Sequence, residues 1–147
     1  MAIDAQRERA LMERLGRIPI VQTLRIRIVE FSAGFCKAVV PRETKYDGIF
    51  ESFHGGLLMT VADSVACFAI MTQTPSDEPL TTTDMNIRFL AACQGDVTVS
   101  ARVIKLGRTL CPVQVDLFDA AGKLVAVSQV TYMRLSAPPR REAASAE

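Results

Sequence analysis

The hydrophobic positions of this chain follow two different periods, and each period predicts a different kind of element. Residues 24–31 alternate between apolar and polar side chains, as in a strand with one buried face, and residues 35–40 form a second strand-like run. Residues 54–71 are apolar on nearly all sides and rich in Leu, Met and Ala, which indicates a long, largely buried helix. Four more strand-like runs follow, at residues 80–90, 97–106, 110–118 and 124–134.

The order of these elements indicates the class of fold. Residues 4–16 favour a short helix capped by Asp4, so the chain reads as a short helix, two strands, one long helix and four strands. Short links favour antiparallel pairing of the last four strands. One long helix packed against a curved antiparallel sheet of about six strands is an α+β arrangement. A sheet wrapped around one apolar helix is the hot-dog architecture.

Length and composition limit the alternatives. A chain of 147 residues is one domain in size. We expect a helical segment at 1–19, the hot-dog domain at 20–135 and a disordered tail at 136–147, which is rich in Pro, Ala, Arg and Glu. The net charge of +1 predicts no strong attraction to nucleic acid or to anionic membranes.

Cysteine spacing and hydropathy indicate the compartment. The four cysteines form no C-x-x-C pair and there is a single His, so no zinc site is predicted. The N-terminus has no apolar signal core, and no apolar run reaches the ~18 residues of a membrane span. We therefore expect a protein of the reducing cytoplasm without disulfides.

Asp63 is the first candidate for chemistry. It lies midway along the most apolar helix, on the side of Gly56, Met59 and Cys67 when ~100° is allowed per residue. Burying a carboxylate there is costly unless it has partners or reaches a polar cavity. It is therefore either a general base or nucleophile, or a helix residue that reaches solvent through a gap or bonds to a neighbouring backbone group.

The start of the same helix is the second candidate. His54, Gly55 and Gly56 stand where unpaired backbone N–H groups create a partial positive charge, and glycine lets a ligand approach the backbone closely. Such a site can stabilise an oxyanion. The glycines are explained equally by a tight turn, with His54 as a cap.

The separation of the two candidates predicts a dimer if both serve one reaction. Nine residues of helix place His54 and Asp63 ~13 Å apart along the axis. Reacting groups must approach to ~3–3.5 Å. Asp63 would then come from a second copy of the chain across a two-fold axis.

Three segments together resemble a known family. The run HGGLLMTVADSVACFAI at 54–70, the run TTTDMNIRFLAACQGD at 81–96 and the last two strands are similar to hot-dog-fold acyl-CoA thioesterases of the PaaI-like group. The resemblance covers about residues 20–135. It implies hydrolysis of an acyl-CoA thioester at a subunit interface without a metal or redox cofactor.

The resemblance also implies roles for individual residues. Asp63 matches the catalytic carboxylate, Gly55 the glycine whose N–H polarises the thioester carbonyl, and His54 a positioning histidine, with Gly56 beside them. Thr82 matches a Ser or Thr near the attacking water. The turn formed by Gly107, Arg108 and Thr109 resembles a segment near the CoA, where Arg108 either meets a phosphate or is a solvated turn residue.

The loop before the helix departs from the family pattern. Many relatives carry an Asn six residues before the His and a small residue three before it, where this chain has Gly48 and Glu51. Asp47 or Glu51 can supply a polar group after a shift of the loop, although neither donates a hydrogen bond as Asn does.

Other functions and assemblies stay open at this stage. A non-catalytic acyl-CoA-binding protein fits the changes in that loop. A dehydratase or hydratase of acyl thioesters also pairs a His with a carboxylate, although such relatives typically begin the helix with a His-Phe-Pro-like sequence. Phe50 and Phe53 suggest an apolar or aromatic acyl group, and core packing explains them equally well. Two dimers can associate into a tetramer through their sheets or through their helices.

Overall fold

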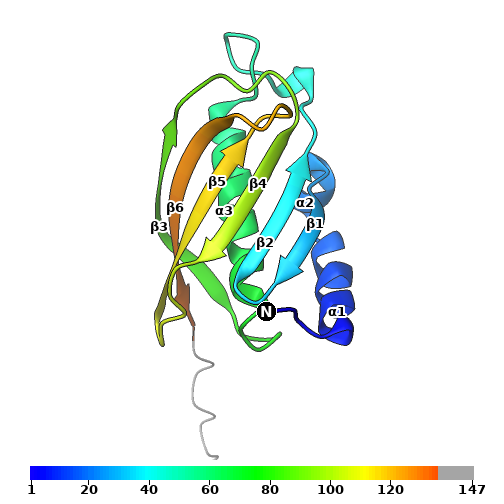
Figure 1. Cartoon of the computed structure of the whole chain (residues 1–147), viewed down its shortest axis with the longest axis vertical. Helices are drawn as coiled ribbons and strands as arrows, with labels where there is room; N and C mark the ends of the chain where they lie inside the picture. Colours follow the sequence, from blue (N-terminus) through cyan, green and yellow to red (C-terminus); the bar gives the residue numbers. More distant parts are fainter. Residues whose placement is uncertain (136–147) are drawn as a thin grey trace, which may run out of the picture.

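Six antiparallel strands and one long helix form the body of residues 1–135, the part of the chain that the computed structural model describes (Figure 1). The strands are β1 (Arg27–Ser32), β2 (Phe35–Val40), β3 (Leu80–Phe89), β4 (Val97–Val103), β5 (Leu110–Phe118) and β6 (Leu124–Arg134). The helices are α1 (Ala5–Gly16), α2 (Pro19–Leu24) and α3 (Gly55–Met71), with a 3-10 turn, η1, at Thr44–Tyr46. The α+β prediction is confirmed. The tail expected at 136–147 lies outside the described residues.

The sheet wraps around α3, which crosses its inner face (Figure 1). Small side chains on α3 let the helix approach the sheet closely, and aliphatic side chains of the strands fill the rest of the core. The fully buried α3 residues include Val61, Ala62, Val65, Ala66, Ala69 and Ile70. Their surroundings include Val99, Val113, Val115, Leu117 and Val130. The core is therefore mostly aliphatic.

One face of α3 is less buried than the apolar pattern predicts. Met59, Thr60, Asp63 and Cys67 are only partly buried, and Gly56 is exposed. These positions are three or four residues apart, so they form a single stripe along the helix. In one chain, the stripe that carries Asp63 is the side of α3 that the sheet leaves partly open.

The strand order is β1-β2-β4-β5-β6-β3. The last four strands pair antiparallel among themselves, as predicted, although β3 pairs with β6 and not with β4, its neighbour in sequence. After β3, the chain crosses the sheet to the position between β2 and β5, where β4 pairs with β2 and completes the core. The inward residues of β4, Val97, Val99 and Ala101, are fully buried there. As a result, β3 is an edge strand.

The prediction for the N-terminal part is confirmed for its first helix and wrong for residues 24–26, which the alternating pattern assigns to a strand. The Asp4 carboxylate caps α1 by accepting from the backbone N–H groups of Gln6 and Arg7, each at 3.0 Å. The strand predicted from residue 24 begins only at Arg27, because Pro19 opens the short helix α2. Leu24 and Ile26 are buried as predicted, but from the helix end and the following turn rather than from a strand.

The remaining strand boundaries shift by a few residues, with β3 ending at Phe89 and β4 at Val103. All four cysteines are free thiols. Among the described residues, no helix combines the length and apolar character of a membrane span.

Candidate active site

His54 is the N-cap of α3 and fixes how the helix begins. Its Nδ1 accepts a hydrogen bond from the Gly56 N–H at 2.9 Å, and its carbonyl accepts from the N–H groups of Leu57 and Leu58. A Cβ on Gly56 would lie 3.1 Å from the imidazole, so glycine leaves room for the ring to fold back. Because Nδ1 accepts, the neutral ring carries its proton on Nε2. The exposed His54 side chain can therefore donate to a ligand.

Gly55 is the first residue of α3, and its N–H has no acceptor within the helix. Among residues 1–135, no hydrogen bond engages this N–H, whereas the Gly56 N–H is taken by His54. The Phe89 ring lies against Gly55, since a Cβ there would be 3.1 Å from Phe89 Cζ. Of the two glycines, Gly55 is the one with a free donor.

Two open hollows flank the start of α3, each of about 340 Å³. The first borders Gly55, and its walls include Phe53, Leu58, Phe89, Leu90 and Ala91. The second borders His54 and Gly56, with walls from Tyr46, Asp47 and Leu57. A ligand held at the helix start therefore has space on either side. Phe53 lines the first hollow, whereas Phe50 is 84% exposed.

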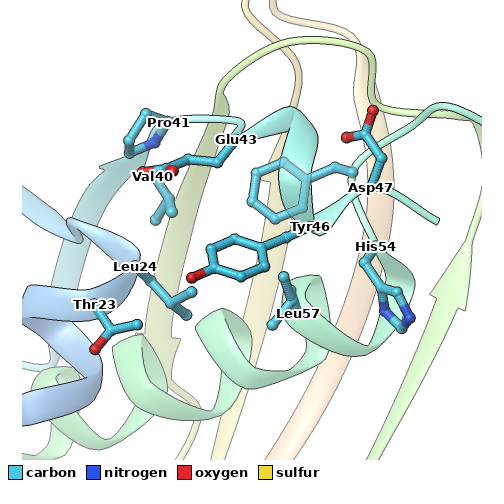
Figure 2. A pocket seen from close by; sticks show the side chains of 10 residues that line it. Thr23, Leu24, Val40, Pro41, Glu43, Tyr46, Asp47, His54 and Leu57 are labelled. Carbon is cyan, nitrogen blue, oxygen red and sulfur yellow. The ribbon is translucent and has the colours of Figure 1, made fainter.

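A third recess, between α2 and α3, is too small for a ligand. It encloses only about 10 Å³. Figure 2 shows the Tyr46 ring above Leu57, and the His54 imidazole turned away from that ring. This recess is packing behind the start of α3.

Asp63 has the partners that a carboxylate on an apolar helix needs. The Thr82 hydroxyl, on β3, donates to Asp63 Oδ1 at 2.7 Å. The Tyr132 hydroxyl, on β6, lies 2.8 Å from the same Oδ1 and 2.9 Å from the Asp63 backbone carbonyl oxygen. Burial raises the pKa of Tyr132 above its ordinary value, so its phenol is a neutral donor. Asp63 is thus held from the sheet by two hydroxyls.

Cys67 lies one turn beyond Asp63 and is the other reactive group on this stripe. Burial raises the pKa of its thiol to about 11. The thiol therefore stays protonated at neutral pH and is a poor nucleophile. Of the two side chains, the Cys67 thiol is therefore the weaker candidate for chemistry.

The turn predicted to lie near CoA is at the Asp63 end of the sheet. The carbonyl oxygens of Gly107 and Thr109 accept hydrogen bonds from Arg134, which is two residues beyond Tyr132 on β6. Arg108 itself is exposed. The structure thus places this turn on the side of Asp63 and Tyr132, away from His54 at the start of α3.

The loop that departs from the family pattern is fixed by an ion pair. Asp47 accepts from Arg42 through both carboxylate oxygens, and this interaction lowers the pKa of Asp47. Arg42 also donates to the backbone carbonyl of Glu51, which has a left-handed φ of 55°. Asp47 is engaged by Arg42, and the Gly48 N–H is bonded to the carbonyl of Ser52, so neither group is free in this loop.

Sequence reasoning selected Asp63 and Thr82 but missed Tyr132. The alternation of β6 places Val130 and Tyr132 on the buried face, which is a weak signal that a polar ring end points toward α3. Nothing in the sequence pairs that ring with Asp63, because the two residues are 69 positions apart.

The chain is similar to known proteins in both sequence and fold. The family described as thioesterase superfamily matches residues 50–126. Acyl-coenzyme A thioesterase 13 of Homo sapiens is 30% identical over 120 residues, covering 80% of this chain and 79% of the relative. The 1,4-dihydroxy-2-naphthoyl-CoA hydrolase of Listeria monocytogenes is 30% identical over 113 residues, covering 75% of this chain and 90% of the relative.

Solved structures agree with the hot-dog prediction. The PaaI protein from the phenylacetic acid degradation operon of E. coli superposes with a TM-score of 0.83 at 18% identity, covering 92% of this chain and 97% of that one. A thioesterase of Haemophilus influenzae superposes with a TM-score of 0.78 at 25% identity, covering 85% and 88%. The hot-dog fold is confirmed.

Proposed function

Because this chain belongs to the thioesterase superfamily, we propose that it hydrolyses the thioester of an acyl-CoA to the free acid and CoA. The observation that carries the proposal is the partly buried Asp63 carboxylate, which two hydroxyls of the sheet hold in place. Asp63 lies on the same helix that begins with the free Gly55 N–H. Relatives at 30% identity are named for hydrolysis of CoA thioesters. We place the protein in the cytoplasm, where its free thiols are stable.

In the proposed reaction, the oxygen of a water molecule bonds to the thioester carbonyl carbon while Asp63 takes one of the water protons. The carbonyl oxygen becomes an oxyanion, which the Gly55 N–H and the N-terminus of α3 stabilise. The carbon–sulfur bond then breaks, the sulfur leaves with the electron pair and takes up the proton, and the acid is released. Side chains, a backbone N–H and water supply every step, so we expect no metal or redox cofactor.

Asp63 can alternatively attack the carbonyl carbon itself. The sulfur then leaves, a mixed anhydride forms on the Asp63 carboxylate, and water hydrolyses the anhydride. Hydrolysis in ¹⁸O-labelled water under single-turnover conditions separates the two routes. A nucleophilic Asp63 gains the label in its own carboxylate when water attacks the Asp63 carbonyl, whereas a general base never does.

The remaining site residues have supporting roles in the proposal. His54 lies beside Gly55 and presents a donor to the carbonyl region of the thioester. Thr82 orients Asp63 or the attacking water. The turn with Arg108 lies at the Asp63 end of the sheet, where its guanidinium is exposed and suited to a CoA phosphate. The hollow beside Gly55, which Phe53, Leu58 and Phe89 help to line, has room for an acyl group.

The proposed site needs two chains. Asp63 is eight residues beyond Gly55 on one helix, ~12 Å along the axis, and both cannot meet the same carbonyl carbon. We therefore propose a homodimer in which Asp63 of one subunit acts with Gly55 of the partner subunit. Two such dimers can form a tetramer, and sedimentation velocity distinguishes the two assemblies.

The edge strand β3 supports this assembly. Within residues 1–135, β3 hydrogen-bonds to β6 alone, so its other edge is free. Antiparallel pairing of two β3 strands around an axis between Met85 and Asn86 would set Thr82 opposite Phe89 of the partner subunit. Thr82 contacts Asp63 and Phe89 lies against Gly55, so such pairing would bring the two half-sites toward each other.

A thiol-release assay tests the function. The wild-type protein should release thiol from at least one member of a panel of short-chain, long-chain and aryl acyl-CoAs. The Asp63→Asn variant should lose this activity, while Asp77→Asn, a matched change on an exposed loop, should keep it. Undiminished turnover by Asp63→Asn would remove Asp63 from the mechanism.

The same panel decides between the rival functions. Tight binding of acyl-CoA without thiol release would instead support a non-catalytic binding protein. Gly48 and Glu51 favour that function, because neither supplies a side-chain donor like that of Asn. Loss of the conjugated absorbance of an enoyl-CoA without thiol release would support a hydratase.

A further inference from the structure

Strand β3 contains an irregularity where it passes Asp63. Thr82 pairs with Tyr132 and Asp84 pairs with Thr131, so Thr83 is an extra residue in the ladder. This β-bulge changes the alternation of the strand, since the partly buried positions are 80 and 82 before it and 85 and 87 after it. Bulges re-aim side chains, and here the result is that Thr82 turns inward directly beside Tyr132.

The two hydroxyls that the bulge brings together act on the same atom. Thr82 Oγ1 and Tyr132 OH lie 2.7 Å and 2.8 Å from Asp63 Oδ1. The other oxygen, Oδ2, accepts no hydrogen bond from residues 1–135, and it is not among their buried, unpartnered polar atoms. The carboxylate is thus divided into one bound oxygen and one free, accessible oxygen.

We propose that Tyr132 is a positioning residue for thioester hydrolysis, which together with Thr82 holds Asp63 Oδ1 so that Oδ2 is the oxygen that meets water or the thioester. The inference rests on the proposed function of Asp63. Tyr132 is only 6% exposed and touches neither hollow, so it acts through Asp63 rather than on the substrate. A free carboxylate on a helix can rotate about χ1 and χ2, and two donors on one oxygen restrict both rotations.

Tyr132 also ties the carboxylate to its own helix backbone. Its single hydroxyl proton is within reach of both Oδ1 and the Asp63 carbonyl oxygen. A buried tyrosine needs only one acceptor, and the carbonyl alone would satisfy it. Because the Tyr132 hydroxyl lies between these two oxygens, it fixes the Asp63 side chain relative to α3 as well as to the sheet.

The test compares two single-hydroxyl deletions on the same strand. Tyr132→Phe removes the hydroxyl and keeps the ring. Ser128→Ala, also on β6, removes a buried hydroxyl that donates to the Asn86 carbonyl of β3 at 2.6 Å and does not contact Asp63. Both variants lose one hydrogen bond between a β6 side chain and a neighbouring element, so urea unfolding shows whether their losses of stability are similar.

Kinetics then separate positioning from stability. We expect Tyr132→Phe to lower kcat by roughly ten- to a hundredfold with KM nearly unchanged, and Ser128→Ala to leave both unchanged. Adding Thr82→Val to Tyr132→Phe should lower kcat by a factor different from the product of the single effects, because both hydroxyls hold one oxygen. A folded Tyr132→Phe variant with wild-type kcat would overturn the proposal.

Crystal structures of both variants provide a readout that needs no activity. The Asp63 carboxylate should change rotamer or show two positions in Tyr132→Phe and stay in place in Ser128→Ala. An unmoved carboxylate in Tyr132→Phe would overturn the role of Tyr132 whatever the kinetics. A wild-type protein that hydrolyses no acyl-CoA would overturn the proposed function instead, and the proposal for Tyr132 in that reaction would fall with it.

Discussion

Replacing Gly55 with proline removes a single backbone N–H at the position where the oxyanion is expected. The substitution suits the local structure, because Gly55 is the first residue of α3 and proline is favoured at that position. His54 has φ −57° and ψ 126°, within the conformations allowed before proline. No hydrogen bond among residues 1–135 is lost, since the Gly55 N–H has no acceptor there.

The alanine variant is the matched control for this change. Alanine and proline both add a Cβ at about the same place, 3.1 Å from Phe89 Cζ, so Phe89 must shift by a few tenths of an ångström in either variant. Only alanine keeps the N–H. The rate ratio between the two variants therefore reports the donor rather than the contact with Phe89.

The loss of one oxyanion donor sets the size of the effect. We expect kcat of Gly55→Pro to be about 10²- to 10³-fold below that of Gly55→Ala, with similar KM, in the thiol-release assay. Thermal unfolding of both variants shows whether α3 is intact. Equal rates for two folded variants would refute the assignment of the Gly55 N–H as the oxyanion donor.

Three further predictions concern the shared site and the loop before α3. Exchange of subunits between Asp63→Asn and Gly55→Pro proteins should restore about a quarter of wild-type activity. About half of the dimers are then mixed, and each mixed dimer holds one intact site out of two. No recovery would contradict a shared site. Glu51→Gly should raise the free energy of unfolding in urea by roughly 0.5–1 kcal/mol by removing the left-handed strain at φ 55°, and an unchanged midpoint would contradict that strain. Arg42 lowers the pKa of Asp47, so their pair stabilises the fold at neutral pH, and this contribution is lost as the pH falls below about 4. Asp47→Asn should therefore cost stability at pH 7 and little at pH 2–3, and an equal loss at both pH values would argue against the pair.

The features predicted correctly from the sequence are those with a strong local signal. The long apolar run and the glycines after His54 predict α3 and its start, because helix periodicity and capping depend on neighbouring residues. Asp63 stands out because a carboxylate on an apolar helix requires an explanation. The resemblance adds Thr82, and the structure places its hydroxyl on that carboxylate.

The features that sequence reasoning misses depend on contacts between distant segments. The bulge at Thr83 has no marker in the local pattern, since it arises from how β3 pairs with β6. The partner of β3 does not follow from the sequence, because short links favour neighbours in sequence, whereas burial of the β4 side chains beside β2 decides the order. The pattern extends the first strand into the end of α2 because the buried residues there happen to continue the alternation.

By itself, the sequence determined that one buried helix would carry a carboxylate and a glycine-rich start, because periodicity and helix ends are local properties. It also determined that the two are too far apart to act within one chain, since the rise per residue of a helix is fixed. Only the tertiary structure decided which oxygen of Asp63 is bound and which is free. That choice depends on hydroxyls from two strands that meet across a bulge, and no local rule connects them.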